Sequence, residues 1–436
     1  MLRCALAIAG CSITGCSSED NLGSHAFGDV RWSVAVGGPG DERPTALAID
    51  TIGNVIVAGT CNGVVEFGTT RADCRGSFIT RRAYDTGREE WTLLLHNTSV
   101  SSLSIDELGY IHAAGSYSGT ADIAGMQLTA TGTDPFLVVL DGNGAVHGLA
   151  GLGVSGIALS PVGVVEPDGC FYVTGGFHGT MQTPDGVVAN HTGELDAYVS
   201  GHFADTSGAW TVQLGGEGEQ LGRALALRGE RLAVLVHSTA AVSIGDQQLE
   251  APAWPASMLM QFAINGELLW AHAMPAPSEH LATTRTGAIL VTMRDSDAAH
   301  IACSRIRAFD IAGRELWASE CEDAQRTIDA IAVGAQGRVV TGGRNLGEGG
   351  EIFLAAHDDT GRAIGNLQSP PSAFVRDSSF DGVAIEPSGE VVFIAGVTHP
   401  FDFGSGALPF AGGRDAVIVK LDSPTGHDGP VVLTRE

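Results

Sequence analysis

Residues 46–59 read Ala-Leu-Ala-Ile-Asp-Thr-Ile-Gly-Asn-Val-Ile-Val-Ala-Gly. Two apolar runs, Ala46–Asp50 and Asn54–Gly59, flank a tight turn that contains a glycine. Short continuous apolar runs bounded by turn residues are typical of β-strands whose two faces are both covered. Aspartate, asparagine and glycine recur at such turns because they tolerate the backbone angles that a tight turn requires. The segment therefore predicts a hairpin inside a sheet that is buried on both sides.

The same strand–turn–strand pattern recurs along the chain, and tryptophans mark its period. Five of the six tryptophans stand roughly 50 to 60 residues apart, with one interval twice as long, and such a period indicates a repeat fold: Trp32, Trp91, Trp210, Trp270 and Trp317. Each unit reads as four short strands joined by turns rich in glycine, aspartate and asparagine. Counting second strands, which begin near Asn54, Tyr110, Phe171, Arg231, Ala288, Arg338 and Glu390, predicts seven units.

A four-stranded sheet of this size cannot bury both of its faces alone. Copies arranged around an axis cover each face with a neighbour and leave only short edges exposed. The repeat therefore predicts an all-β fold: a seven-bladed β-propeller of four-stranded antiparallel blades over residues 29–436. The alternative, an open β-solenoid, usually has shorter repeats of roughly 20 to 30 residues.

The strand at residues 29–36, which contains Trp32, has no unit of its own before it. We expect it to form the outer edge of the last blade and so to close the ring with an N-terminal strand. Residues 430–435, Pro-Val-Val-Leu-Thr-Arg, could fill the same position. The tryptophan strand is preferred because an indole buries more apolar area than these side chains do.

Residues 1–20, MLRCALAIAGCSITGCSSED, combine one arginine with an apolar stretch that is too short to span a bilayer. The stretch ends in a segment, Ile13-Thr14-Gly15-Cys16, that resembles the lipobox of bacterial lipoproteins. This resemblance implies a lipoprotein signal peptide at residues 1–15, a lipidated Cys16 and a tether at residues 16–28. A second frame that ends at Cys11 also fits, and the remaining alternatives are an ordinary signal peptide or a mistranslated start.

The cysteines are consistent with export, because disulfides persist outside the cytosol. Cys61 and Cys74 are close in sequence, as are Cys303 and Cys321, and we predict a disulfide in each pair. Metal binding is the competing interpretation, but the spacing lacks a CxxC or a paired histidine motif. We therefore predict no metal site. Cys170 is left over, and we expect it to be a buried, unreactive thiol.

Composition and motifs exclude several classes of function. The formal net charge is −26, from 50 acidic and 24 basic residues, and Lys420 is the only lysine. Such an acidic surface disfavours binding to nucleic acid. The sequence contains no nucleophile elbow, zinc-protease motif or phosphate-binding loop. We therefore assign no catalytic residue and no cofactor.

Segments Gly53–Gly59, Gly115–Asp122 and Gly412–Asp422 resemble the repeats of bacterial secreted β-propeller proteins (the SBBP-type repeat), which are common in surface lipoproteins. A second segment, Arg307–Trp317, resembles the Asp-x-x-x-Gly-x-x-x-Trp docking motif of quinoprotein-like propellers, with one residue fewer between its aspartate and glycine. This likeness implies that the five repeat tryptophans dock one blade onto the next. The likeness does not imply a quinone cofactor, because the cofactor site of those proteins needs a disulfide between adjacent cysteines and this chain has no such pair.

These observations favour a non-catalytic binding or scaffold module, lipid-anchored at the bacterial outer membrane or cell surface. The expected partner is an unidentified protein or an envelope polymer, the membrane contact is the lipid alone, and the expected state is a monomer. The alternative is an envelope hydrolase with carboxylates at the propeller channel.

If Cys16 carries the lipid, the Cys16→Ala chain should leave the membrane fraction, because a lipidated chain holds to a bilayer through its buried acyl groups. Membrane fractionation followed by detergent phase separation measures this. Cys11→Ala is the matched control and should fractionate as the unmodified sequence does. Identical behaviour of the Cys16→Ala chain would refute the assignment.

Overall fold

The computed structural model describes residues 29–183, 186–190, 194–250, 256–296, 302–320, 326–345, 352–368, 378–403 and 406–422. The described residues form β-strands and no helix, which confirms the all-β prediction. None of these residues therefore forms a helix long and apolar enough to cross a bilayer. The predicted signal peptide, both candidate lipidation cysteines (Cys11 and Cys16) and the tether lie outside the described residues.

The described strands form one long sheet of eleven strands, four sheets of four strands, one small sheet of three strands and one hairpin of two strands. The long sheet contains β2 (Arg43–Ile49), β3 (Val55–Glu66), β4 (Arg71–Arg82), β5 (Glu89–Ile105), β6 (Ile111–Ile123), β7 (Met126–Leu140), β8 (Val146–Gly151), β10 (Ile157–Val165), β11 (Phe171–His178), β14 (Asp196–His202) and β15 (Gly208–Leu214). The small sheets are β9 (Gly153–Val154) with β12 (Thr180–Thr183) and β13 (Gly186–Asn190), and β18 (Val242–Ile244) with β19 (Gln247–Leu249).

Each four-stranded sheet is an antiparallel meander, and in the last one the N-terminal strand takes the outer place. These sheets are β16 (Gln220–Arg228), β17 (Arg231–Ser238), β20 (Ala256–Ala263) and β21 (Leu268–Met274); β22 (Ser278–Thr283), β23 (Ile289–Ser296), β24 (Ala302–Phe309) and β25 (Glu315–Ala318); β26 (Arg326–Val333), β27 (Val339–Asn345), β28 (Ile352–His357) and β29 (Ala363–Gln368); and β30 (Ser379–Ile385), β31 (Val391–Val397), β32 (Asp415–Leu421) and β1 (Val30–Val36).

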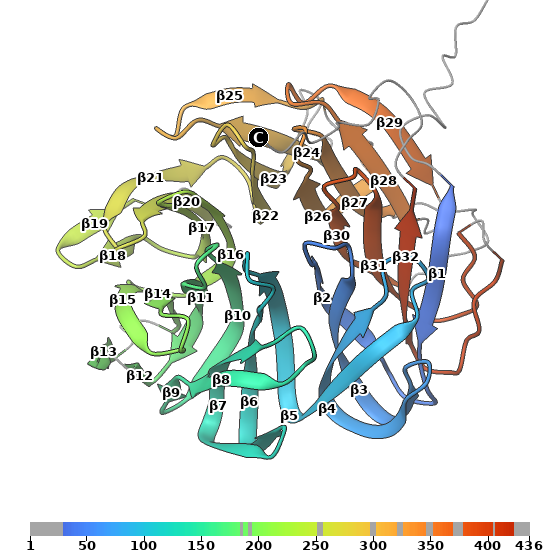
Figure 1. Cartoon of the computed structure of the whole chain (residues 1–436). Helices are drawn as coiled ribbons and strands as arrows, with labels where there is room; N and C mark the ends of the chain where they lie inside the picture. The colour runs from blue at the N-terminus through green and yellow to red at the C-terminus, as the bar shows by residue number, and fades with distance from the viewer. Residues whose placement is uncertain are drawn as a thin grey trace, which may run out of the picture.

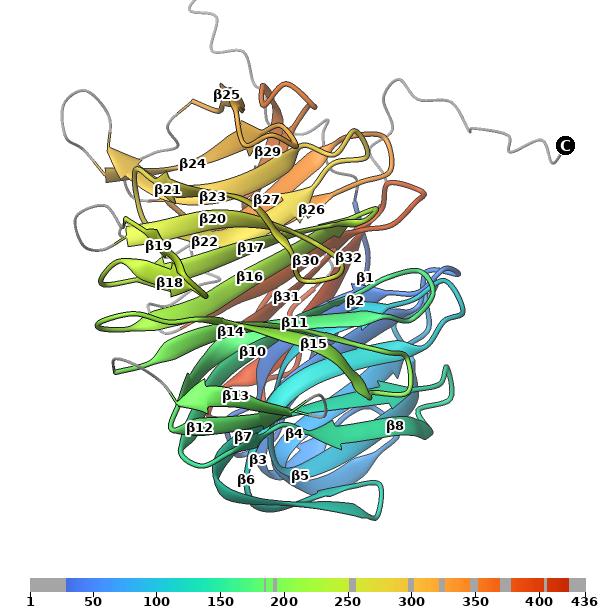
Figure 2. The same ribbon diagram turned by 90° about the vertical axis from the view of Figure 1, so that its left-hand side faces the viewer.

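The sheets are arranged radially around a central axis (Figure 1), and Figure 2 shows them from the side. The strands nearest the axis touch one another in a cycle: β2 contacts β5, and the contacts continue through β10, β16, β22, β26 and β30 back to β2. The outer strands β1, β21, β25 and β29 lie at the periphery of the ring (Figure 1). This is the arrangement of a β-propeller.

The prediction of separate four-stranded sheets is wrong for the first part of the chain. The outer strand that holds Trp91 and the next inner strand were expected to be distinct, but β5 runs through both without a break. Its register against β6 shifts at His96/Thr98 and at Val100/Ser102, and Asn97 has a φ of 58°. Bulges bend a strand without ending it, so β5 belongs to two consecutive units. A single parallel pairing of Ile157 with Thr133 then links the third unit to the same sheet.

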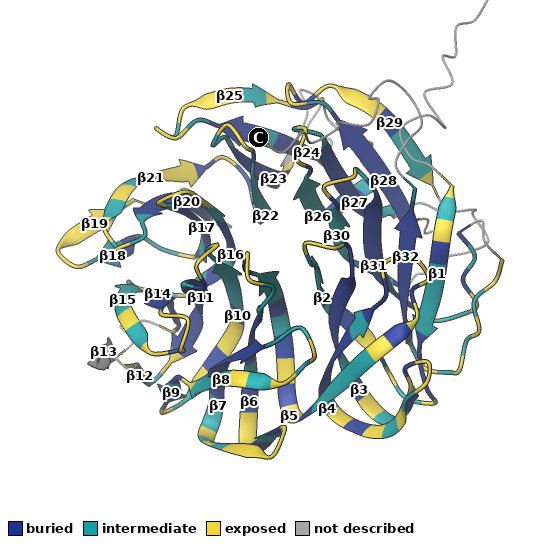
Figure 3. Cartoon of the chain, viewed as in Figure 1, coloured by how far each residue is buried: buried dark blue, intermediate teal, exposed yellow. Residues whose placement is uncertain are grey.

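The middle strands of the sheets form the core. Every residue of β14, β28, β31 and β32 is buried, whereas the outer strands are partly exposed (Figure 3). Burying one Val, Ile, Leu or Phe side chain contributes roughly 1.5–3 kcal/mol. The continuous apolar runs in the sequence thus mark strands that have a neighbouring sheet on each side.

β1 and the loop that follows it join the last sheet to the first. β1 pairs antiparallel with β32, and Ala35 lies opposite Val417. Residues 37–42 then lead to β2 of the first sheet, and the Glu42 N–H donates to the carbonyl of Arg414, the residue just before β32 of the last sheet, at 2.7 Å. The N-terminal strand therefore occupies the outer edge of the last sheet, as expected, and residues 430–435 lie outside the described residues. We call this junction between the last and first sheets the closing seam.

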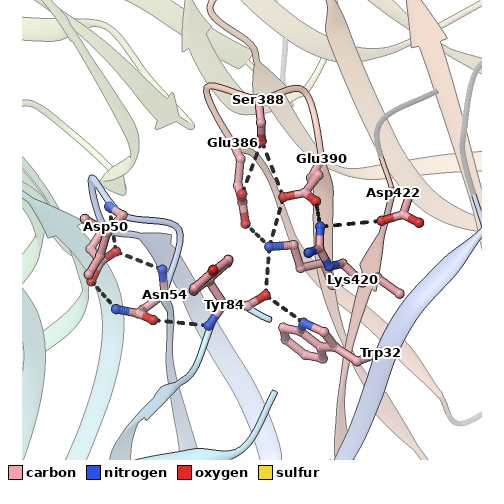
Figure 4. A network of polar contacts seen from close by, with 11 residues as sticks. Trp32, Asp50, Asn54, Tyr84, Glu386, Ser388, Glu390, Lys420 and Asp422 are labelled. Carbon is pink, nitrogen blue, oxygen red and sulfur yellow. Dashed lines mark hydrogen bonds and ion pairs between the residues drawn. The ribbon is translucent and has the colours of Figure 1, made fainter. Parts of the chain in front are cut away.

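The only lysine of the chain is fully buried at one end of the closing seam (Figure 4). The Lys420 ammonium lies 2.5 Å from Glu386 Oε1 and 3.1 Å from Glu390 Oε2, and it donates to the Tyr84 carbonyl at 3.0 Å. The Trp32 indole N–H donates to the same carbonyl at 3.0 Å. Two strands of the last sheet are thus tied to one turn of the first.

The network extends on both sides of Lys420 (Figure 4). Arg31 of β1 forms an ion pair with Glu390. On the side of the first sheet, the Tyr84 N–H donates to Asn54 Oδ1 at 3.1 Å, and Asn54 Nδ2 donates to Asp50 Oδ2 at 3.0 Å. Burial and the neighbouring Glu390 raise the pKa of Glu386 to about 7, although Lys420 opposes this.

Lys420→Met should destabilise the protein by about 3–5 kcal/mol, because it leaves two buried carboxyls without their cation. The raised pKa of Glu386 means that its contribution favours folding below the unfolded value near 4.5 and is lost as the pH rises through about 7. Without the lysine both carboxyls hold protons more tightly, so the loss in melting temperature should be larger at pH 8 than at pH 5. Arg71→Met, at an exposed pair with Glu66, is the control. An equal loss at both pH values would contradict this account.

Candidate functional site

A groove of about 860 Å³ lies where turns of three neighbouring sheets meet. Its lining includes residues 166–168 between β10 and β11, residues 228–230 between β16 and β17, and residues 285–287 between β22 and β23. The first and third turns of an antiparallel meander lie at the same end of the sheet. The groove therefore belongs to the face that carries these turns. Apolar, half-buried side chains are also among the lining residues, Leu227 and Ile264 for example.

Tight turns hold the lining residues in place. The Gly169 N–H donates to the Glu166 carbonyl at 3.0 Å, and the Gly287 N–H donates to the Thr284 carbonyl at 3.0 Å. Both glycines have positive φ angles, 93° and 87°, in the region that other residues rarely adopt. Both turns are thereby fixed by a backbone hydrogen bond next to the residues that line the groove.

Three carboxylates are among the lining residues: Glu166, Asp168 and Glu230. Tyr172 on β11 donates its hydroxyl to Glu166 Oε1 at 2.8 Å, and its ring lies 6.0 Å from the ring of Trp210. Burial raises the pKa of Glu166, and the charges of Asp168 and Glu230 raise it further, while the tyrosine hydrogen bond lowers it. Glu166 therefore holds a proton more readily than an ordinary glutamate.

Two exposed arginines contribute the positive charge of the groove. Arg228 Nη2 donates to the Arg285 carbonyl at 3.0 Å, and Arg285 Nη1 donates to the Ala335 carbonyl at 3.3 Å. In the part of the chain that the structure describes, both guanidinium groups thus bond to backbone oxygens. A guanidinium has five N–H donors, so each keeps donors for a carboxylate or phosphate of a ligand. The lining of the groove therefore combines charges of both signs with apolar side chains.

Cys170 lies close to two of the carboxylates that line the groove, Glu166 and Asp168. Glu166, Asp168 and Cys170 each place one potential metal-ligand atom within 4.8 Å of the others. Burial raises the pKa of the Cys170 thiol to about 11, and the charges of Asp168 and Glu166 add to the effect. Only a thiolate is a good metal ligand or nucleophile, so we assign neither role to Cys170.

The five tryptophans predicted to dock the blades lie at the junctions between consecutive repeat units. Four of them donate their indole N–H to a carbonyl in a turn of the next unit: Trp32 to Tyr84 at 3.0 Å, Trp91 to Gly142 at 3.0 Å, Trp210 to Ile264 at 2.7 Å and Trp270 to Ile311 at 2.9 Å. Trp317 covers Gly361 of the following turn, which leaves no room for a Cβ there. This is the geometry that docking requires, and the energetic role of these contacts stays a prediction.

One of the two predicted disulfides lies wholly within the described residues. Cys61 and Cys74 are bonded, with Cα atoms 5.7 Å apart, across the hairpin of β3 and β4. Cys303 is also disulfide-bonded, but Cys321 lies outside the described residues, so the pairing of these two stays a prediction. Cys170 is free, as expected, but it is half-buried and not fully buried, because it lies just before β11 beside an exposed turn.

None of the residues singled out from the sequence lines the groove. The missed residues include Glu166, Arg228, Glu230 and Arg285. A signal was present: the turn between first and second strands contains Asp50 and Asp106 in the first two units, but Arg228 and Arg285 in the fourth and fifth. This departure from the repeat marks the place where charge of the opposite sign gathers.

No family model matches the chain, and no curated protein matches it. Among solved structures, the WD40 β-propeller domain of Doa1 is similar with a TM-score of 0.50 and 10% identity, over 92% of this chain and 98% of that one. BamB from Moraxella catarrhalis has a TM-score of 0.39 and 12% identity, over 90% of this chain and 99% of that one. The β-propeller domain of the Trilobed protease from Pyrococcus furiosus has a TM-score of 0.40 and 12% identity, over 72% and 86%. The likeness to the Doa1 domain shows the β-propeller fold.

Cys170 should react slowly with iodoacetamide at pH 7.5, and the rate should rise steeply as the pH approaches the raised pKa of about 11. Asp168→Asn removes a neighbouring negative charge, so it should lower that pKa and speed the reaction at a fixed pH. Mass spectrometry of the Cys170 peptide measures the rate, and Cys170→Ser identifies the signal. A rate like that of a free cysteine at pH 7.5 would show that burial does not control this thiol.

Proposed function

We propose that this protein is an exported, lipid-anchored and non-catalytic β-propeller that binds a protein or an envelope polymer at the bacterial cell envelope. The groove at Glu166, Arg228 and Arg285 is the observation that carries the proposal. It joins turns of three sheets into one surface, with both signs of charge beside apolar side chains. Such combinations are typical of ligand sites, where apolar contact supplies affinity and a few polar groups fix orientation.

The proposed molecule has seven blades and is closed by β1. The cycle of contacts among β2, β5, β10, β16, β22, β26 and β30 supports this count, since each of these strands begins one unit of the repeat. The pairing of β1 with β32 supports closure by the N-terminal strand. An experimental structure with another number of units around the axis would overturn the count.

Export and lipidation rest on the leader sequence and its cysteine at position 16. The disulfide between Cys61 and Cys74 supports an oxidising compartment. The formal charge of −26 supports a partner other than nucleic acid. The likeness to SBBP-type repeats supports the same location, and we propose a monomer that contacts the membrane only through its lipid.

One observation favours the alternative, an envelope hydrolase. Glu166 has a raised pKa and shares the groove with Asp168 and Glu230. A carboxyl that keeps its proton beside an ionised carboxylate is the arrangement used for acid–base hydrolysis of glycosides. Tyr172, however, occupies Glu166 Oε1 with a hydrogen bond, and this favours binding over proton transfer.

The purified chain, immobilised and exposed to solubilised envelope components, should retain a specific species through the groove. The double variant Arg228→Glu/Arg285→Glu should retain at least about tenfold less of that species, because it replaces both arginines of the groove by acidic residues. Moderate salt should weaken the interaction of the unmodified chain as well. Measuring retention across a salt series by quantitative mass spectrometry gives both effects.

Arg75→Glu is the matched control, since Arg75 is an exposed arginine in the hairpin of β3 and β4. It should retain as much as the unmodified chain does. Equal retention by the double variant would place binding elsewhere. Hydrolysis of an added glycan or ester that disappears in Glu166→Gln would replace the binding proposal with the enzymatic one.

A further inference from the structure

The turns that line the groove follow one another around the ring in the order of the repeat units. The Glu107 N–H, in the turn between β5 and β6 of the second unit, donates to the Pro167 carbonyl of the third unit at 3.2 Å. The inner strand β10 of the third unit contacts β16 of the fourth, and β16 contacts β22 of the fifth. A ligand that lies along the groove therefore meets the third, fourth and fifth units in that order.

The sign of the charge changes along this order. The turn of the third unit contributes two acids, that of the fourth one base and one acid, and that of the fifth one base: Glu166 and Asp168, then Arg228 and Glu230, then Arg285. The end of the groove nearer the second unit is therefore acidic. The end nearer the sixth unit is basic.

The acids and bases of the groove are not paired with one another. Within the described ranges, Arg228 and Arg285 donate to backbone carbonyls and form no ion pair with a carboxylate. In the same part of the chain, no basic side chain forms an ion pair with Asp168 or Glu230, and all four of these residues are exposed. Charge-assisted hydrogen bonds are stronger than neutral ones. Both ends of the groove can therefore form such bonds with charges that a ligand supplies.

Exposed apolar side chains adjoin the acidic end. Leu108 is 76% exposed and lies in the turn that contacts Pro167, which is itself exposed. Phe203 is 52% exposed, and a Cβ added to Gly169 would lie 3.0 Å from Cβ of its neighbour Ala204. We call Leu108, Pro167 and Phe203 the apolar patch. Exposed apolar side chains that gather in one place mark interaction sites, whereas single ones are ordinary.

This combination matches a polypeptide better than a polymer with one repeating charge. A polyanion would be repelled by the acidic end and by the formal net charge of −26, and a polycation would be repelled by the two arginines. A polypeptide can carry a cation, an anion and an apolar side chain in a set order, with about 3.3–3.6 Å between successive residues of an extended segment. Charge complementarity then selects the partner and fixes its register.

We propose that the groove receives an extended segment of a partner protein in which a basic residue stands between an apolar residue and an acidic one. This inference rests on the proposed function and names the class of its ligand. The basic residue pairs with Asp168 and Glu230, the acidic residue pairs with Arg228 and Arg285, and the apolar residue covers the apolar patch. Apolar contact supplies affinity, while the order of the charges rejects other segments.

The test is selection of displayed random peptides of about twelve residues, each of which reaches roughly 40 Å when extended, on the purified and immobilised chain. The retained peptides should share a basic residue between an apolar and an acidic one, read in either chain direction. One retained peptide is then synthesised beside a copy in which its basic and acidic residues are exchanged. The exchanged copy should bind at least about tenfold more weakly in fluorescence anisotropy, because it places like charges together at both ends of the groove.

Two double variants separate the contacts. Arg228→Glu/Arg285→Glu should bind the retained peptide at least about tenfold more weakly, and it should prefer a copy whose acidic residue is replaced by lysine. Leu108→Ser/Phe203→Ser should weaken binding about tenfold through lost apolar contact, with the preference for charge order unchanged. Leu316→Ser, on the outer strand β25 and 54% exposed, is the matched control and should bind as the unmodified chain does.

The inference is overturned if the exchanged peptide binds as well as the original, or if the selected peptides share no such order. It is also overturned, with the proposed function intact, if the envelope species retained through the two arginines survives digestion of the extract with protease. The ligand is then an envelope polymer. Retention that does not depend on the arginines is the distinct result that removes the proposed function and this inference with it.

Discussion

Each sheet of this protein is apolar on both faces, and the rest of the architecture depends on this constraint. Strands such as β14, β28 and β31 are buried along their whole length. A sheet of this kind needs a neighbour on each side, because burial of its two faces supplies most of the favourable free energy. In a row of sheets the first and last would each leave one face in water. A cycle of contacts avoids this, and it requires the two ends of the chain to meet.

The regularly spaced tryptophans contact the following repeat unit and so fix how closely consecutive units pack. Each of these five indoles extends from an outer strand and covers a turn of the next repeat unit, where a glycine leaves room for the ring. Gly87 has a φ of 67°, and a Cβ added to it would lie 2.6 Å from the Trp32 ring. The glycine is thus required twice, for the backbone angle and for the contact. This pairing explains why tryptophans and glycine turns share one period in the sequence.

The repeat, the all-β fold and the disulfide between Cys61 and Cys74 could be predicted from the sequence, because each leaves a local pattern. The continuity of β5 could not be predicted, because it depends on bulges near Asn97 that no residue type indicates in the sequence. The groove was also missed. Its residues come from three units far apart in the sequence, and only the ring brings their turns together. Lys420 stood out as the only lysine, but its burial between two glutamates depends on the pairing of both chain ends.

The chain has 50 acidic residues and only 24 basic ones. Basic partners for acids that are buried between sheets are therefore few, and the closing seam shows the consequence. At Glu386 the partner is a lysine of the chain itself, so that contact forms whenever the seam closes. Glu42 forms no ion pair with a basic side chain among the described residues, and burial, followed by the charge of Asp415, raises its pKa to about 7. Its carboxyl therefore keeps a proton near neutral pH, and its contribution to folding is lost as the pH rises through about 7. Glu386 has a pKa raised to about 7 as well, so the stability of both ends of the closing seam depends on pH in the same direction.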